Sequence, residues 1–322
     1  MVNYNGVIQN SKAFNIVLKD KKQDKLSHTY LLLSEDQDYC CAFAKEFAKV
    51  VFNAMDNNVA TIKIDKEVHP DVIVLGKSEK ITTEVASNLS GDVVVRPFEG
   101  DFKIYVLLNL DEATEEAQNK LLKTIEEPPK SVFFVLCAKT ERKLLQTVLS
   151  RSKKIELDLL GATQIKAMLE SVGVDSNNAD ICSAFSEGVF SRANKMATDK
   201  EFLSLYQNVY RCLGQMNSSR DVLYFTSIFS QKNISKEELS DIFMLISRDL
   251  IMVKIGKEGL VKNKHMLTQM REICQGFSVL ALSRIVEYCL QLKEDLVYNT
   301  NSVEAVDEFL LKIVEAKVKC KK

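Results

Sequence analysis

The sequence has few of the features that mark exported, membrane-spanning or strongly nucleic-acid-binding proteins. None of its apolar runs approaches the roughly 18 residues that a membrane-spanning helix needs. The first residues also lack the basic and apolar regions of a signal peptide, so we expect a cytoplasmic protein with no membrane partner. The 43 basic and 44 acidic residues give a formal net charge of −1. Bulk charge therefore offers no reason for the isolated chain to bind nucleic acid.

Cysteine, proline and glycine are also informative by where they are missing. The eight cysteines form no CxxC pair and lie in apolar surroundings, which indicates reduced thiols in the core and neither a metal site nor a redox motif. All four prolines fall within the first 160 residues. The last lysines of the chain, Lys317, Lys319, Lys321 and Lys322, are expected to form a solvated end.

The first 160 residues have the pattern of an α/β domain. Short β-branched runs predict strands at 29–33, 72–75, 104–108 and 131–137, and amphipathic stretches between them predict helices at 39–52 and 115–125. Continuous apolar strands that alternate with helices indicate a parallel sheet covered on both faces. Thr114 is expected to cap the second of these helices, and Pro128-Pro129 to end it.

The remainder of the chain has a different pattern. After residue 160 apolar residues recur at three- and four-residue spacing, which predicts helices only. A chain of 322 residues also exceeds what one hydrophobic core usually fills. We therefore expect three domains: an α/β domain over 1–158, a small helical domain over 159–205, and a larger helical domain over 206–322.

A nucleotide-binding α/β domain would carry its phosphate loop after the strand at 29–33, but the glycines are missing there. No glycine occurs between Gly6 and Gly76, and the connection Ser34–Asp38 holds three carboxylates that would repel a triphosphate. The triplet Gly76-Lys77-Ser78 has the last letters of a phosphate loop, yet the glycine required five residues earlier is Asp71. We interpret this triplet as a chance match.

Residues for hydrolysis are equally scarce. Asp111 and Glu112 follow a predicted strand, where an acidic pair could hold magnesium, but they fall in the turn before Thr114. We expect them to be solvated turn residues. No histidine lies in a pattern that suggests a catalytic triad.

Five segments, in this order, give the sequence a family resemblance: Leu26–Leu31, His69–Asp71, Arg96–Gly100, Ala117–Pro129 and Leu149–Ser152. Together they resemble the N-terminal AAA+ module of bacterial DNA polymerase III clamp-loader subunits. The resemblance covers roughly residues 1–205, where Glu187–Ala193 is similar to the sensor-2 segment of the family's helical lid. The remainder resembles the family's collar only in length, in its helical pattern and in Asn299-Thr300-Asn301.

The resemblance implies a subunit that has lost its own ATP site. Leu108 and Asn109 stand where the family's acidic pair would be, and Ala138 and Lys139 stand near the sensor-1 threonine. The Ser-Arg-Cys motif survives as Ser150-Arg151-Ser152. Arg151, with Ser150 beside it, is therefore expected to act in trans as an arginine finger for a neighbouring subunit.

The same resemblance implies partners and the absence of cofactors. The expected partners are the motor (tau/gamma) subunits and the delta subunit, with the sliding clamp and primer-template DNA reached through the complex. No bound nucleotide is expected, because the phosphate loop is missing. No zinc is expected either, because residues 53–66 lack the four cysteines of the zinc module found in many family members. Two alternatives stay open: a self-sufficient ATPase of the same fold, and the clamp-opening delta subunit itself.

Overall fold

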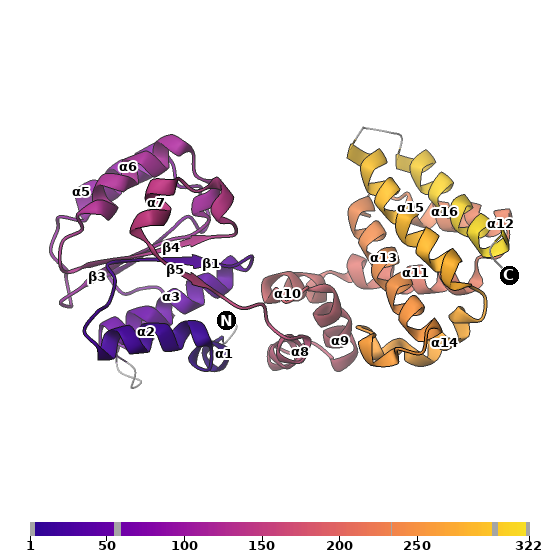
Figure 1. The fold of residues 1–322 in the computed structure, drawn as a ribbon, viewed down its shortest axis with the longest axis horizontal. Coiled ribbons are helices and arrows are strands. Elements are labelled where there is room, and N and C mark those ends of the chain that lie inside the picture. Colours follow the sequence, from indigo (N-terminus) through magenta and orange to yellow (C-terminus); the bar gives the residue numbers. More distant parts are fainter. Residues whose placement is uncertain (1–3, 55–58, 233, 298–301, 320–322) are drawn as a thin grey trace. The chain divides into compact units, whose positions relative to one another are not determined.

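The computed structural model describes residues 4–54, 59–232, 234–297 and 302–319. Contacts within the chain divide it into two compact units (Figure 1). The first runs up to Leu160 and includes Val189–Ser191, and the second consists of Gly161–Gly188 and Arg192–Lys322. The helices on both sides of residue 205 group in one unit, so the three-domain division stays a prediction.

The first unit is built on a five-stranded parallel sheet. Its strand order is β2-β3-β4-β1-β5, and every neighbouring pair is parallel. The strands are β1 (Thr29–Leu33), β2 (Val72–Leu75), β3 (Lys103–Leu107), β4 (Val132–Ala138) and β5 (Lys153–Glu156). The α/β prediction and its four strands are confirmed. The edge strand β5 was not among the strands expected, because its sequence Lys-Lys-Ile-Glu has no apolar run.

Helices cover both faces of this sheet (Figure 1). One face carries α1 (Asn5–Gln9), α2 (Lys12–Lys22) and α3 (Gln37–Val51), with α4 (Val59–Asp65) packed on α3. The other carries α5 (Thr83–Asp92), α6 (Glu115–Glu126) and α7 (Gln146–Arg151). Helix α6 begins as predicted, because the Thr114 hydroxyl accepts a hydrogen bond from the Ala117 backbone N–H.

Two of the segments that carry the family resemblance hold each other in the fold. The Asp71 side chain is 1% exposed, and its carboxylate accepts backbone N–H bonds from Phe98, Glu99 and Gly100 at 2.5, 2.7 and 3.1 Å. A buried carboxylate is stable only when it is paired or well hydrogen-bonded, and here three donors meet it. The His-Pro-Asp segment therefore fixes the path of the Arg96–Gly100 loop.

The second unit is helical throughout its described part. Its longer helices pack as the pairs α13–α15, α15–α16, α12–α16 and α13–α14. Its helices are α8 (Ala162–Ser171), α9 (Ser176–Phe185), α10 (Phe190–Thr198), whose start belongs to the first unit, α11 (Lys200–Gln215), α12 (Ser219–Phe229), α13 (Lys236–Lys254), α14 (Leu267–Cys274), α15 (Val279–Val297) and α16 (Ser302–Lys319), with the short 3-10 turns η3 (Glu258–Leu260) and η4 (Lys264–Met266). In the described ranges no single helix is long and apolar enough to cross a membrane, although the bent pair 264–274 and 279–295 passes that length and composition test jointly.

One expectation about the C-terminal lysines is wrong. Lys317 is only 8% exposed, because its ammonium donates to the Met216 carbonyl at 3.1 Å and lies 4.8 Å from the centre of the Phe277 ring. Lys321 and Lys322 lie outside the described residues, as does Asn299-Thr300-Asn301. The seven described cysteines are buried and form no disulfide, as predicted, and Cys320 lies outside the described residues.

Candidate functional site

In the connection from β1 to α3, a side chain of the chain itself occupies the position where a phosphate would bind. The first backbone N–H groups of a helix have no partner within the helix, which makes a helix N-terminus favourable for an anion. At α3 the anion comes from the chain itself. Asp36 is 3% exposed and caps the helix, with its Oδ1 accepting from the Tyr39 backbone N–H at 3.2 Å.

The other carboxylate oxygen of Asp36 ties together three distant segments. Oδ2 accepts from the backbone N–H of Ser191 at 3.0 Å, and the Tyr4 hydroxyl approaches it at 3.5 Å. The Tyr4 ring stacks on Tyr39 at 5.4 Å and meets the edge of Phe190 at 5.6 Å. Burial, followed by the nearby Asp36 carboxylate, raises the pKa of Tyr4 above its ordinary value, so its hydroxyl stays protonated and able to donate.

Asn109 has a structural role at the position where the family's acidic pair would be. It follows β3 in the left-handed conformation, with φ 52°. Its side-chain amide donates to the Gly76 carbonyl at 3.0 Å, and its backbone N–H donates to the side-chain oxygen of Gln37 at 3.0 Å. An amide at this position joins three loops at the carboxyl edge of the sheet and offers no charge to a metal ion.

The Gly76-Lys77-Ser78 triplet is explained by backbone geometry. Gly76 has φ +81°, and a Cβ placed on it would lie 2.2 Å from the Leu108 carbonyl oxygen. Only glycine fits such a close approach at a positive φ. Lys77 forms an ion pair with Glu67 at 2.8 Å. Both conspicuous residues of the triplet therefore have roles in the fold, in agreement with the interpretation of a chance match.

The expectation that Asp111 is solvated is wrong. Asp111 lies in the 3-10 turn η1 (Leu110–Glu112), is 6% exposed, and accepts the backbone N–H of Lys139 at 3.2 Å. Glu112 pairs with the Lys139 ammonium at 2.9 Å, and that contact lowers its pKa. The two carboxylates hold the end of β4 against this turn. Within the described part of the chain, no group of three or more His, Cys, Asp or Glu side chains is arranged to hold a metal ion.

Arg151, in contrast, is exposed and makes only local contacts. It is the last residue of α7, and 39% of its side chain is exposed. One guanidinium nitrogen donates to the Thr147 carbonyl at 3.2 Å and to the Ser150 hydroxyl at 3.3 Å, and the other lies 2.9 Å from a Glu126 carboxylate oxygen. The structure thus brings Ser150 and Arg151 together on the surface, without any buried partner.

The sheet topology separates Arg151 from the closed position at Asp36. Arg151 precedes the first residue of β5 by two positions, and that residue, Lys153, pairs with Tyr30 near the start of β1. Asp36 instead follows the last residue of β1. In a parallel sheet these two places lie at opposite ends of the strands, separated by roughly 15 Å along a five-residue strand. Arg151 is therefore too far from the Asp36 position to act on anything bound there.

Sequence reasoning identified the closed loop but missed the residues that close it. Asp36 could have been recognised as a cap, because it directly precedes an amphipathic helical pattern. Tyr4 and Ser191 give no such signal, since they reach Asp36 from positions 32 residues before it and 155 residues after it. Arg192, in the expected sensor-2 segment, pairs with Glu187 at 2.9 Å.

Comparisons with known proteins relate the chain to subunits of DNA polymerase III. Residues 9–160 match the family described as DNA polymerase III, delta subunit. The chain is 22% identical over 317 residues to DNA polymerase III subunit delta' of Bacillus subtilis, covering 94% of this chain and 96% of that protein. It is also 33% identical over 102 residues to DNA polymerase III subunit tau of Escherichia coli, covering 32% of this chain and 16% of that protein.

Among solved structures, a gamma-subunit-related DNA polymerase III protein of Thermotoga maritima is 14% identical and has a TM-score of 0.44. It covers 94% of this chain and 99% of that one.

The fold is a parallel α/β module, in which Asp36 occupies the N-terminus of α3 after β1, followed by a helical region. Residues 9–160 match the DNA polymerase III delta-subunit family, and over nearly its full length the chain is similar to a delta-prime subunit of the clamp loader.

Proposed function

We propose that this chain is a non-hydrolysing, delta-prime-type subunit that stabilises the clamp-loader ring and supplies Arg151 to the ATP site of a neighbouring subunit. The observation that carries the proposal is the position of Arg151. It is exposed, it lies at the edge of the sheet opposite the chain's own nucleotide position, and its contacts are local. A planar guanidinium placed in this way stabilises the charge of a transferring phosphoryl group across an interface.

The same geometry supports a subunit that is not an ATPase by itself. A bound triphosphate would need the N–H groups of α3 that Asp36 already occupies, and would meet carboxylates in place of a lysine. Displacing Asp36 would also leave the Ser191 N–H without its partner. These costs count against the self-sufficient ATPase. The purified chain should show no binding of ATP in a calorimetric titration at millimolar concentration with magnesium, and stoichiometric binding would contradict this part of the proposal.

The proposed partners follow from the family. The motor (tau/gamma) subunits and the delta subunit would surround this chain in a cytoplasmic complex, and the sliding clamp and primer-template DNA would be reached through that complex. The division into an α/β core, a helical lid over 159–205 and a helical collar over 206–322 belongs to the same proposal, with the collar seating the subunit in the ring. Co-purification with the motor subunit tests the assembly directly.

The decisive experiment replaces Arg151 by alanine and measures clamp loading and ATP hydrolysis by the reconstituted complex. Assembly should be unchanged, because an exposed guanidinium contributes within about 0.5 kcal/mol to stability. Hydrolysis at the one affected site should fall by on the order of a thousandfold. The total rate would fall less, since other sites keep their own arginines, and clamp loading is therefore the more sensitive measurement.

The matched control is Arg142→Ala. Arg142 is another exposed arginine, in the short turn before α7, and it should leave loading unchanged. An assembled Arg151→Ala complex that loads clamps like the parent would return Arg151 to the status of an ordinary surface residue.

A further inference from the structure

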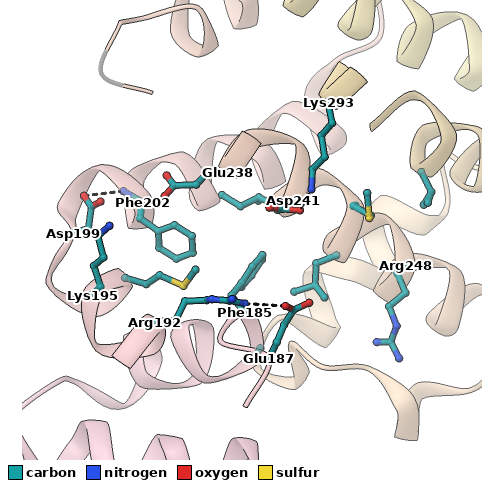
Figure 2. A pocket seen from close by; sticks show the side chains of 16 residues that line it. Phe185, Glu187, Arg192, Lys195, Asp199, Phe202, Glu238, Asp241, Arg248 and Lys293 are labelled. Carbon is teal, nitrogen blue, oxygen red and sulfur yellow. Dashed lines mark hydrogen bonds and ion pairs between the residues drawn. The ribbon is translucent and has the colours of Figure 1, made fainter. Parts of the chain in front are cut away.

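The helical unit contains a pocket that has no part in the proposed role of Arg151. It has a volume of about 790 Å³ and is lined from α9, α10, α11, α13 and α15 (Figure 2). Pockets for small ligands typically measure roughly 300–1,000 Å³ and combine an apolar lining with a few polar groups. This pocket is therefore large enough for a small molecule.

The apolar part of the lining is aromatic and sulfur-rich. Phe185 and Phe202 contribute rings that are 8% and 2% exposed and pack edge to face at 5.7 Å. Met196 and Met244 add half-buried thioether chains. Methionine side chains adapt their shape at low cost and make favourable contacts with aromatic rings. Such a lining fits a flat or flexible apolar body.

Most of the charged side chains around the pocket are already paired. Arg192 contacts Glu187 at 2.9 Å, and Lys293 contacts Asp241 at 2.5 Å (Figure 2). Arg248 is engaged by Asp249 at 2.8 Å. The opposite charges within each pair cancel, so these side chains give the pocket no preference for the sign of a ligand's charge.

Glu238, like Lys195 and Asp199, has no ion pair among the described residues. It lines the pocket beside Phe202, on the side where Asp199 and Lys195 also lie (Figure 2). Burial raises the pKa of Glu238, followed by the charge of Asp199, and Asp241 and Glu237 add smaller effects in the same direction, while Lys195 lowers it. A half-buried carboxylate in a net negative surrounding is stabilised by any cation that can reach it.

We propose that this pocket binds a small organic cation with an apolar body, its ammonium or guanidinium group beside Glu238 and its body against Phe185, Phe202 and the two methionines. The cation gives Glu238 a direct counter-charge, which Lys195 supplies only from beyond ion-pair distance, and the apolar body fills volume that is otherwise left to water. The site lies within the helical unit and is independent of the proposed role of Arg151.

The test uses the full chain with isotope-labelled methionine methyl groups. Met196→Leu and Met244→Leu assign the two reporter signals among the nine methionines. The probes are 4-phenylbutylammonium, the alcohol 4-phenylbutanol and the anion 4-phenylbutyrate, which share one apolar body and differ in charge. We expect the ammonium to shift both reporter signals most strongly, the alcohol less, and the carboxylate least.

Two substitutions assign the charge preference to its residue. Glu238→Gln should weaken binding of the ammonium by about fivefold, the effect of a partly exposed ion pair, and leave the alcohol unchanged. Lys195→Gln should strengthen ammonium binding by a similar factor, because it removes the competing cation. Glu272→Gln, an exposed glutamate of α14 that does not line the pocket, is the matched control and should change nothing.

A second arm separates a free ligand from a side chain presented by a partner. If the reporter signals shift when the motor subunit is added without any amine, the cation is a lysine or arginine of that subunit; if they do not, the ligand is a small molecule. The proposal is overturned if the ammonium shifts neither methionine, if the three probes bind equally, or if Glu238→Gln binds the ammonium as well as the parent does.

Discussion

Two regions at opposite ends of the strands in the first unit, around Asp36 and around Arg151, differ in how their polar groups are used. At the carboxyl edge, Asp36 and Asn109 are bound by neighbours from several segments, and Asp36 is almost completely buried. Near the start of the strands, Arg151 hydrogen-bonds within its own helix and pairs with the exposed Glu126, and it has no further polar contact among the described residues. Asp36 and Asn109 have become part of the fold, whereas Arg151 contributes almost nothing to it.

This difference teaches how a chain can satisfy the N-terminus of a helix with an anion of its own. A bound triphosphate satisfies the free N–H groups at the start of a helix, and without it those groups need another acceptor. Here a carboxylate of the chain supplies it and also holds Ser191. An exposed arginine with weak local contacts has no such structural reason to be where it is, and that favours a role outside the chain.

The strongest way to break the comparison is to change the chemistry of residue 151 while keeping its charge. At the affected ATP site, Arg151 is expected to raise the rate of hydrolysis on the order of a thousandfold. Arg151→Lys should lose most of this enhancement. A lysine ammonium is a point charge and cannot reproduce the planar two-pronged contact of a guanidinium. The measurement is clamp loading by the reconstituted complex. Full activity of the lysine variant would show that only positive charge is needed at this edge.

At the other edge, the expected effect concerns stability. Asp36→Ala should destabilise the first unit by roughly 2–3 kcal/mol, because it removes a helix cap and leaves the Ser191 N–H without a partner. Urea denaturation gives the free energy, and hydrogen exchange across 37–51 reports on α3 itself. A loss below about 0.5 kcal/mol would mean that Asp36 does not hold this edge together.

Asp38 provides the matched control, with the opposite sign. Burial, followed by the Asp36 charge, raises the pKa of Asp38. A raised pKa means that the carboxyl group favours folding below its ordinary range, and that this advantage is lost as pH rises through the higher, folded value. At neutral pH the charge is therefore unfavourable, and Asp38→Asn should leave stability equal or slightly raised. The difference from the parent should shrink as pH falls, which a pH series of denaturation curves would measure.

The Gly76 turn should respond less strongly. Gly76→Ala places a Cβ at a positive φ and against the Leu108 carbonyl, with an expected cost of about 1–3 kcal/mol. Gly91→Ala is the control: this glycine lies in α5 with no atom within 4 Å of an added Cβ, and alanine there should stabilise by about 0.4–1 kcal/mol. Thermal unfolding compares the two, and equal shifts would refute the role assigned to the turn.

The sequence predicted the elements of the first unit better than it predicted their polar contacts. Strands such as β4 are buried on both faces, and a continuous apolar run reveals them directly. The edge strand β5 is short, and three of its four residues are charged, so it has no apolar run to reveal it. Asp111 looked like a turn residue, and only the fold brings the Lys139 N–H to it. Long-range partners of this kind depend on tertiary structure and leave no local pattern in the sequence.

The smallest predicted effect tests whether Arg151 is free to leave its resting contacts. Glu126→Gln removes the carboxylate from an ion pair in which both side chains are 39% exposed, so the free energy of unfolding should change by less than about 0.5 kcal/mol. Hydrolysis by the reconstituted complex should stay the same or rise by up to about fivefold, because the guanidinium no longer gives up a partner when it reaches across the interface.

Glu127→Gln, the exposed neighbour outside this pair, should match the parent in both measurements. A loss of more than about tenfold in Glu126→Gln alone would reverse the argument. It would make Glu126 the residue that positions Arg151, and the contrast between the buried Asp36 and the exposed Arg151 would no longer hold.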